Sequence, residues 1–308
     1  MSDQRFVILL YHGVTTANHR GIENCSRKHI PAREFAGQME YLAGTHTVLS
    51  MSSLLRAQRE GGIPSRAVAV TFDDGFQNNY TAAFPILQRY GIPATFYLST
   101  GLIGTGEVFW VDKLEYLLNE TPLKSLELMT MEKAYRLQTA AERAAALQDI
   151  KVDLKTKPGR LQEVLGELES VAKTPCRYDY EDYQTLTWDQ VRVMRQSGLC
   201  EFGAHTVDHA ILSHLSTEGK RYQIRYSKRQ LEAELQEPVE LFSYTEGLAH
   251  HYDDETIAIL RAEGFSSSPT AIFGVNSRDT SPFHLHRNMV AMTAPFEQCV
   301  EVPFAPCR

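Results

Sequence analysis

Two short motifs contain residues whose types and spacing could form a hydrolytic metal site. The motif TFDDG provides two adjacent carboxylates, Asp73 and Asp74. The motif HTVDH provides two imidazoles four residues apart, His205 and His209. Such a histidine pair can bind one cation together with a carboxylate from the other motif, and this leaves an open position for water. The combination is suited to metal-assisted hydrolysis, whereas each motif alone also fits an acidic turn or a pair of structural histidines.

Both motifs follow predicted strands, which would bring them to one end of a sheet. Short runs of β-branched and aromatic residues alternate with amphipathic helical stretches, a pattern typical of parallel α/β folds. The predicted strands span residues 6–11, 67–72, 94–98, 199–204 and 241–244, and the predicted helices span residues 34–42, 78–90, 188–196 and 254–262. In such folds active residues lie on the loops that leave the C-terminal ends of the strands.

Residues 121–175 differ in composition from the rest of the chain. They contain many charged residues but a single aromatic one, Tyr135. Apolar residues recur there at helical spacing, and Pro158-Gly159 interrupts the pattern. We therefore predict two helices with a solvated face, inserted between units of the main fold.

Composition excludes several classes of protein. The chain has 308 residues, 43% of them hydrophobic, and a net charge of −7, so broad electrostatic binding to nucleic acid or to an anionic membrane is not expected. Its five cysteines are scattered without the spacing of a disulfide framework or a thiolate zinc site. The N-terminus lacks the features of a signal peptide, and no stretch approaches the ~20 apolar residues of a membrane span. We expect a cytoplasmic protein.

The motifs together resemble those of the polysaccharide deacetylases, the NodB-homology group of carbohydrate esterase family 4. The resemblance rests on TFDDG and GAHTVDHAILSHLS, and it extends through YGIPATFYLSTGLIG, FWVDKLEYLL, LTWDQVRVMRQSGLCEFGAH and SKRQLEAELQEPVELFSYTEG. It covers most of the chain outside the helical insertion. It implies an α/β fold, a distorted (β/α)7-type barrel forming one domain over residues 1–308, with residues 121–175 as a helical insertion within it.

The resemblance also implies roles for the four polar residues. Asp73 would be the catalytic base, while Asp74, His205 and His209 would bind a divalent metal. The implied metal is Zn²⁺, with Co²⁺ or another divalent ion as alternatives. This division is chemically reasonable, because a base must remain free to accept the proton of the attacking water.

The general acid is expected near the N-terminus, after the first strand, whereas the family usually has it on the last strand. Many relatives use a histidine on their last strand, and the C-terminal VPFAPCR offers none. The first strand instead ends in Tyr11-His12-Gly13, which is similar to the variant whose final strand has moved to the N-terminus. We predict His12 as the acid and keep His286 as the weaker alternative. Arg287 could orient a carboxylate or bind substrate, although a structural role is the simpler interpretation.

One motif departs from the family pattern. Relatives commonly have FxYPxG, whereas this chain has FSYTEG, which places Thr245 and Glu246 after Tyr244. The backbone N–H of Thr245 is expected to stabilise the oxyanion, and Tyr244 is predicted either to contact substrate or to form a buried wall. Trp110 is a candidate sugar platform, and packing of a helix is its alternative.

We predict a metal-dependent hydrolase that removes N-acetyl groups from an N-acetylated amino sugar or glycan. An O-acetyl esterase or another amidohydrolase would use the same site. A non-catalytic carbohydrate-binding relative is the more distant alternative, suggested by the altered FSYTEG motif. The expected partner is a carbohydrate with N-acetyl groups, and the sequence predicts no oligomeric state.

Overall fold

The computed structural model describes residues 4–290 and 295–301 and divides into two compact units. Unit 1 comprises the described residues of Met1–Thr16, Lys28–Gly106 and Thr185–Arg308, and unit 2 comprises Ala17–Arg27 and Glu107–Gln184. Unit 2 therefore contains the predicted insertion, residues 121–175, and extends beyond it on both sides. The assignment of the whole chain to one barrel domain stays a prediction.

The strands of unit 1 pair in a distorted, mostly parallel ring. Strands β1 (Arg5–Tyr11), β5 (Ala67–Phe72), β6 (Ala94–Leu98) and β9 (Cys200–Ala204) pair in that order, all parallel. Isolated parallel bridges continue from Ala204 to Phe242, from Leu241 to Ser267 and from Pro269 to Leu285. Strand β11 (Asn288–Met289) then pairs in parallel with β1 and closes the ring. The α/β barrel class predicted from the sequence is confirmed.

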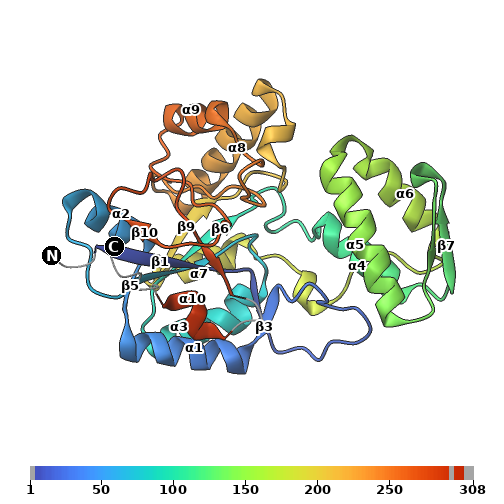
Figure 1. Cartoon of the computed structure of the whole chain (residues 1–308), viewed down its shortest axis with the longest axis horizontal. Coiled ribbons are helices and arrows are strands. Elements are labelled where there is room, and N and C mark those ends of the chain that lie inside the picture. Colours follow the sequence, from blue (N-terminus) through green and yellow to red (C-terminus); the bar gives the residue numbers. More distant parts are fainter. Residues whose placement is uncertain (1–3, 291–294, 302–308) are drawn as a thin grey trace, which may run out of the picture. The chain divides into compact units, whose positions relative to one another are not determined.

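Helices and short strands surround this ring. Figure 1 shows α1 and α3 on one side of the strands and α8 and α9 on the other. The helices of unit 1 are α1 (Ala32–Thr45), α2 (Met51–Glu60), α3 (Phe84–Tyr90), α7 (Trp188–Gln196), α8 (Thr217–Leu235), α9 (Asp254–Ala262) and α10 (Phe296–Val300). Its remaining strands are β2 (Gly13–Thr15), β3 (His29–Pro31), β4 (Thr47–Leu49) and β10 (Asn276–Ser277). A π-helical turn at Asn79–Ala83 precedes α3, where one continuous helix was predicted from residue 78 to residue 90, and a 3-10 turn lies at Leu212–His214.

Alternation along the strands separates two apolar clusters. On β5, Ala67 and Ala69 belong to a cluster that also contains Tyr97, Leu241 and Leu285 from other strands and segments of the ring, so this cluster fills the barrel interior. The alternate residues of β5, including Val68 and Phe72, belong to the larger cluster beneath the helices. Because side chains alternate with a period of two, each position along a strand has a defined direction, either into the barrel or toward the helices.

Glycine is required at one position of the interior. A Cβ atom on Gly203 of β9 would lie 2.7 Å from the carbonyl oxygen of Leu241 and 2.7 Å from the Tyr97 ring. Gly203 therefore allows the neighbouring segment and the buried Tyr97 side chain to approach β9 closely.

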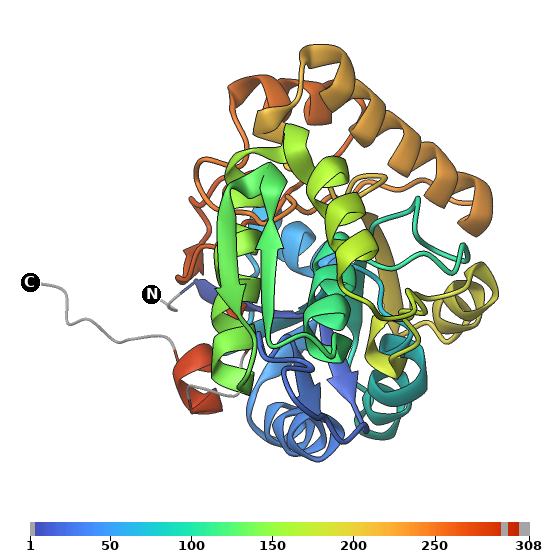
Figure 2. The same cartoon turned by 90° about the vertical axis from the view of Figure 1, so that its right-hand side faces the viewer.

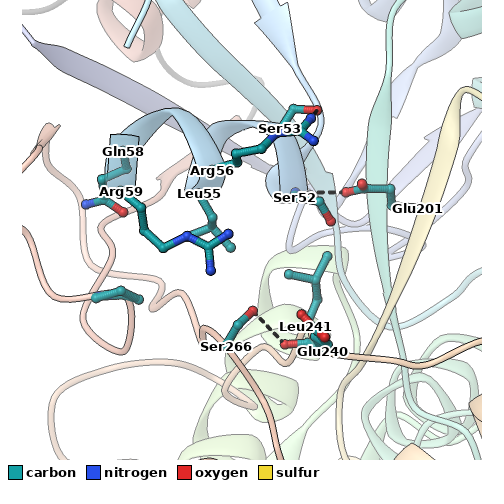
Figure 3. A pocket seen from close by; sticks show the side chains of 11 residues that line it. Ser52, Ser53, Leu55, Arg56, Gln58, Arg59, Glu201, Glu240, Leu241 and Ser266 are labelled. Carbon is teal, nitrogen blue, oxygen red and sulfur yellow. Dashed lines mark hydrogen bonds between the residues drawn. The ribbon is translucent and has the colours of Figure 1, made fainter. Parts of the chain in front are cut away.

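Unit 2 has its own apolar core. Its helices are α4 (Trp110–Glu120), α5 (Ala140–Thr156) and α6 (Leu161–Val171), with an antiparallel hairpin of β7 (Ser125–Leu128) and β8 (Lys133–Arg136), visible in Figure 2, and 3-10 turns at Met129–Met131, Pro158–Arg160 and Glu181–Tyr183. The predicted apolar spacing is confirmed, because Leu147, Ile150 and Leu168 are all buried in this core. The hairpin was not predicted.

The described residues bear on two further expectations. No helix among them has the length and apolarity needed to cross a membrane. Among the described residues, Cys25, Cys176, Cys200 and Cys299 are free cysteines. Cys307 lies outside the described residues.

Candidate active site

The four residues of the predicted metal site come together at the C-terminal end of the ring. Asp73 and Asp74 directly follow β5, and His205 and His209 follow β9. Ser99, which follows β6, joins the two loops, because its N–H donates to the carbonyl oxygen of Asp74 at 3.2 Å and its hydroxyl to that of His205 at 3.1 Å. The strand pairing therefore positions the site.

Asp74, His205 and His209 have the arrangement of three ligands around one cation. Their ligand atoms all lie within 4.8 Å of one another. Asp74 Oδ1 lies 3.2 Å from His209 Nε2 and 3.6 Å from His205 Nε2. This oxygen is buried and accepts no hydrogen bond from the described residues. A buried carboxylate oxygen facing two imidazole nitrogens fits a divalent ion such as zinc, which binds this donor set in hydrolases.

The backbone at and near these ligands adopts left-handed conformations, which residues other than glycine rarely adopt. Asp74, Thr206 and His209 have φ values of 76°, 67° and 60°. Left-handed backbone at non-glycine residues costs about 1–3 kcal/mol each and persists where surrounding contacts enforce it. Here the loop after β6 supplies such contacts, because the N–H of Thr100 donates to the carbonyl oxygen of Thr206 at 3.1 Å. The Gln223 side chain of α8 also accepts a hydrogen bond from the N–H of Val207 at 2.8 Å.

Asp73 is paired with a fully buried arginine. Arg287 donates from Nη1 to Asp73 Oδ1 at 2.7 Å and from Nη2 to Asp73 Oδ2 at 2.6 Å, and its side chain has no exposed surface. Its Nε donates to the carbonyl oxygen of Thr270 at 2.7 Å, which fixes the plane of the guanidinium. The sequence suggested that Arg287 could orient a carboxylate, and this geometry does so for Asp73. Its assignment to substrate binding stays a prediction.

Ser243 is a site residue that the sequence analysis missed. Arg287 Nη2 donates to the Ser243 hydroxyl at 2.8 Å, and this hydroxyl lies 3.4 Å from Asp73 Oδ2. The Ser243 carbonyl oxygen accepts a hydrogen bond from Nδ1 of His205 at 2.9 Å, which directs Nε2 toward Asp74. Ser243 points in the same direction as Leu241, which lies in the barrel interior, because side chains two residues apart share one side of a strand. The sequence alone does not show which side of this short segment faces the interior.

The same alternation explains the position of Tyr244, which points toward the helices. Its ring stacks on Tyr252 with centroids 4.0 Å apart, and its hydroxyl donates to the carbonyl oxygen of Phe283. Tyr244 is only 1% exposed, so its surroundings favour the alternative of a buried wall residue. His286 shares this outward direction, because it lies between Leu285 and Arg287, which point into the barrel.

Three further predicted residues have different surroundings. His12 follows β1 next to the site, since the N–H of Asp73 donates to the carbonyl oxygen of Tyr11 at 3.0 Å. Thr245 is buried, and its hydroxyl lies 3.4 Å from that of Thr206. Trp110 begins α4 in unit 2 and packs against that unit's core. The catalytic and substrate-binding roles of these three residues stay predictions.

The surroundings favour the ionised form of both carboxylates and the neutral form of His12 and His205. Burial raises the pKa of Asp73, but Arg287 and His205 outweigh it, so the net pKa is below the ordinary value. Burial likewise raises the pKa of Asp74, and His209 with the other imidazoles lowers it further than burial raises it. Burial lowers the pKa of His12 and of His205 despite the nearby carboxylates. Neutral imidazoles and an ionised carboxylate are the protonation states that a metal requires of its ligands.

Acidification is therefore expected to destabilise the metal-free protein. Because folding lowers the pKa of His12 and His205, the unfolded chain binds more protons below their ordinary pKa of 6.5. The stability they contribute is complete above that pH and is lost as the pH falls toward their folded values. Thermal unfolding in a chelator should show a melting temperature that falls from about pH 7 to about pH 5. His12→Gln should reduce this slope, and a melting temperature that rises on acidification would contradict the assignment.

A separate pocket lies at the opposite end of the strands. It has a volume of about 320 Å³ and is lined by residues of α2, by Glu201 near the start of β9, and by Glu240, Leu241 and Ser266. Figure 3 shows Arg56 and Arg59 of α2 beside this pocket, together with Glu201, whose carboxylate accepts a hydrogen bond from the N–H of Ser52. This pocket is separate from the site formed by Asp74, His205 and His209. Glu201 lies near the start of β9, whereas His205 follows the end of the same strand.

Comparison with known proteins identifies one family. The family model described as polysaccharide deacetylase matches residues 60–267. YxkH of Bacillus subtilis, whose name assigns it to the polysaccharide deacetylases, is 21% identical over 286 residues, covering 92% of this chain and 71% of the relative. The poly-beta-1,6-N-acetyl-D-glucosamine N-deacetylase of Staphylococcus epidermidis is 38% identical over 74 residues, covering 24% of this chain and 26% of the relative.

The fold is also similar to that of a solved structure. The Streptococcus pyogenes deacetylase PplD, in complex with acetate, superimposes with a TM-score of 0.65 and 20% identity. The superposition covers 97% of this chain and all of that one. At this identity the likeness concerns the fold, and it agrees with the parallel ring described above.

Proposed function

Since this chain belongs to the polysaccharide deacetylase family, we propose that it hydrolyses the N-acetyl groups of an N-acetylated amino sugar or glycan with the help of a divalent cation. The observation that supports this most directly is the convergence of Asp73, Asp74, His205 and His209 from the ends of two strands. A base and a three-ligand site so close together suit amide hydrolysis.

Asp74, His205 and His209 would hold the cation. Two imidazoles with one carboxylate favour zinc, and cobalt or another divalent ion fits the same donors. When bound, the cation supplies Lewis acidity, which polarises an amide carbonyl and lowers the pKa of water. His205 is held for this task by its hydrogen bond to the Ser243 carbonyl oxygen.

Asp73 would accept the proton of the attacking water. Its Oδ2 lies 3.9 Å from His205 Nε2, beside the ligands, while Arg287 keeps the carboxylate ionised and fixed in position. The water oxygen forms a bond to the acetamide carbon as its proton moves to Asp73. Asp73 is not among the three residues whose ligand atoms converge, and this supports the proposed division of roles between Asp73 and Asp74.

His12 would donate the proton that the departing amine requires. Because burial lowers the pKa of His12 in the free protein, it would have to take up this proton in the substrate complex before it donates it. The carbon–nitrogen bond breaks, the nitrogen takes this proton, and acetate and a free amino sugar result. The backbone N–H of Thr245 is the proposed donor to the negative oxygen formed on the way. The hydrogen bond between Asp73 and the last residue of β1 supports this role for His12, because it holds the loop that carries His12 against the base.

Removal of the metal is expected to abolish acetate release. Protein treated with a chelator and then dialysed should release acetate from N-acetylglucosamine oligomers at the background rate, and zinc or cobalt should restore turnover. These oligomers are the first choice because the Staphylococcus epidermidis relative is named for a polymer of that sugar. O-acetylated and N-formylated sugars complete the panel, since the same site would hydrolyse them.

Two outcomes would change the proposal. Turnover confined to the O-acetyl or N-formyl compounds would assign a different substrate bond. Glycan binding with bound metal but without release of any acyl group would indicate a carbohydrate-binding relative. A cytoplasmic location remains part of the prediction and requires a separate test by cell fractionation.

A further inference from the structure

Ser243 makes two different contacts with the proposed catalytic groups. Its hydroxyl accepts a hydrogen bond from Arg287 Nη2 at 2.8 Å and faces Asp73 Oδ2 at 3.4 Å. Its carbonyl oxygen accepts a hydrogen bond from His205 Nδ1 at 2.9 Å. The side chain thus contacts the proposed base, and the main chain contacts a proposed metal ligand.

We propose that Ser243 is a positioning residue that sets the Asp73 carboxylate relative to the His205 imidazole. The proposal rests on the proposed function, since it assigns no chemistry of its own to Ser243. The two parts of the residue act independently. Its hydroxyl fixes the base, and its carbonyl group fixes the ligand.

The hydroxyl is placed to limit movement of the carboxylate and the guanidinium together. The carboxylate group of an aspartate rotates easily about its last side-chain torsion. The two hydrogen bonds from Arg287 therefore fix Asp73 only if the guanidinium of Arg287 is itself fixed. The guanidinium is held by two hydroxyls, because Nη1 donates to Thr71 at 3.3 Å and Nη2 donates to Ser243 at 2.8 Å. Ser243 has no exposed surface, so water does not replace its hydroxyl in the folded protein.

The carbonyl group is fixed by the backbone rather than by the side chain. The N–H of Ser243 donates to the carbonyl oxygen of Ala204 at 2.9 Å, which joins this segment to the end of β9 directly before His205. Replacement of the side chain therefore leaves the contact with His205 intact. This separation makes the proposal testable with a single substitution.

Ser243→Ala is expected to reduce kcat by about 10- to 100-fold, because a displaced base is costly even when it remains present. KM should stay within about threefold of the wild-type value, since the hydroxyl contacts the base and not the proposed substrate groups. The absorption spectrum of the cobalt-substituted protein and its metal content should not change. Ser243→Cys, which preserves the shape with weaker hydrogen bonding, should show an intermediate kcat.

Ser267→Ala is the matched control. Ser267 is also fully buried, on the adjacent segment of the ring, and its hydroxyl has no hydrogen-bond partner among the described residues. Its replacement should leave kcat, KM and the cobalt spectrum unchanged. A Ser243→Ala enzyme with wild-type kcat would overturn the proposal, and so would one that loses the cobalt spectrum together with kcat.

An unfolding experiment tests the proposal without turnover. In a double-mutant cycle on the metal-free protein, Ser243→Ala and Arg287→Leu should be coupled by at least about threefold in the unfolding equilibrium constant, since the two groups are in contact. Absence of coupling would overturn the positioning role. A wild-type protein that binds cobalt but releases no acyl group from any compound would instead contradict the proposed function, while the coupling still tests Ser243.

Discussion

Asp73→Asn is expected to reduce acetate release by about 10²- to 10⁴-fold while the protein retains its metal. The amide keeps the size of the carboxylate but cannot take up the proton of water. Asp74, His205 and His209 remain, so zinc content after dialysis should equal that of the wild type. The measurements are the rate of acetate release and the metal content of the same sample.

The adjacent Asp74→Asn substitution is the matched contrast. It should reduce both the rate and the metal content, because it removes a proposed ligand instead of the base. Asp73→Asn also leaves the buried Arg287 charge without its carboxylate, so thermal unfolding must confirm that the variant is folded at the assay temperature. A folded Asp73→Asn protein with wild-type turnover would show that the base is another group.

Arg287→Leu should destabilise the protein by about 3–5 kcal/mol, the usual result of removing one partner of a buried ion pair. Asp73 then lies buried without its compensating charge, and its pKa should rise above the present, lowered value. Turnover should fall as well, because the base is less well oriented without the two hydrogen bonds from Arg287. Denaturant unfolding and the rate of acetate release measure the two effects separately.

Arg225→Leu is the control for this prediction. Arg225 pairs with Glu263 at 2.7 Å on the surface, so its loss should change stability little. Arg287→Lys, which keeps the charge but not the two-pronged geometry, should preserve more stability than Arg287→Leu but still have reduced turnover. Equal stability of the wild type and Arg287→Leu would show that the buried pair contributes nothing net to folding.

The sequence predicts the elements that carry the metal-type site with good accuracy. The strand expected at residues 67–72, which precedes Asp73, has the observed bounds, and the strand expected at 199–204, which precedes His205, begins one residue later than expected. The strand expected at 94–98 and the helices expected at 188–196 and 254–262 also have the observed bounds. These segments have a clear local signal, either a continuous buried run or a helical period ended by a glycine nearby. Local pattern alone therefore predicts that the TFDDG and HTVDH motifs lie at the ends of strands.

The far side of the ring has no comparable signal. It is completed by isolated bridges at Leu241, Phe242, Ser267, Pro269 and Leu285, which are too short to produce an alternating pattern. For this reason the sequence indicates Tyr244 as a candidate site residue on the strength of its residue type. It does not show that the neighbouring Ser243 is the residue that points to the site. Unit 2 presents the same difficulty, since Ala17–Arg27 joins a segment that begins at Glu107 and no local pattern connects them.

The apolar interior beneath Arg287 affects how protons leave the site. Tyr97, Leu241 and Leu285 fill the barrel there, and the guanidinium lies 5.7 Å from the centre of the Tyr97 ring. Among the described residues, this cluster contains no carboxylate or imidazole that could relay a proton accepted by Asp73. We therefore expect the proton to return to solvent at the end of the ring where Asp74, His205 and His209 lie. If acetate leaves at this same end of the ring, acetate retained there would also slow the return of Asp73 to its ionised form.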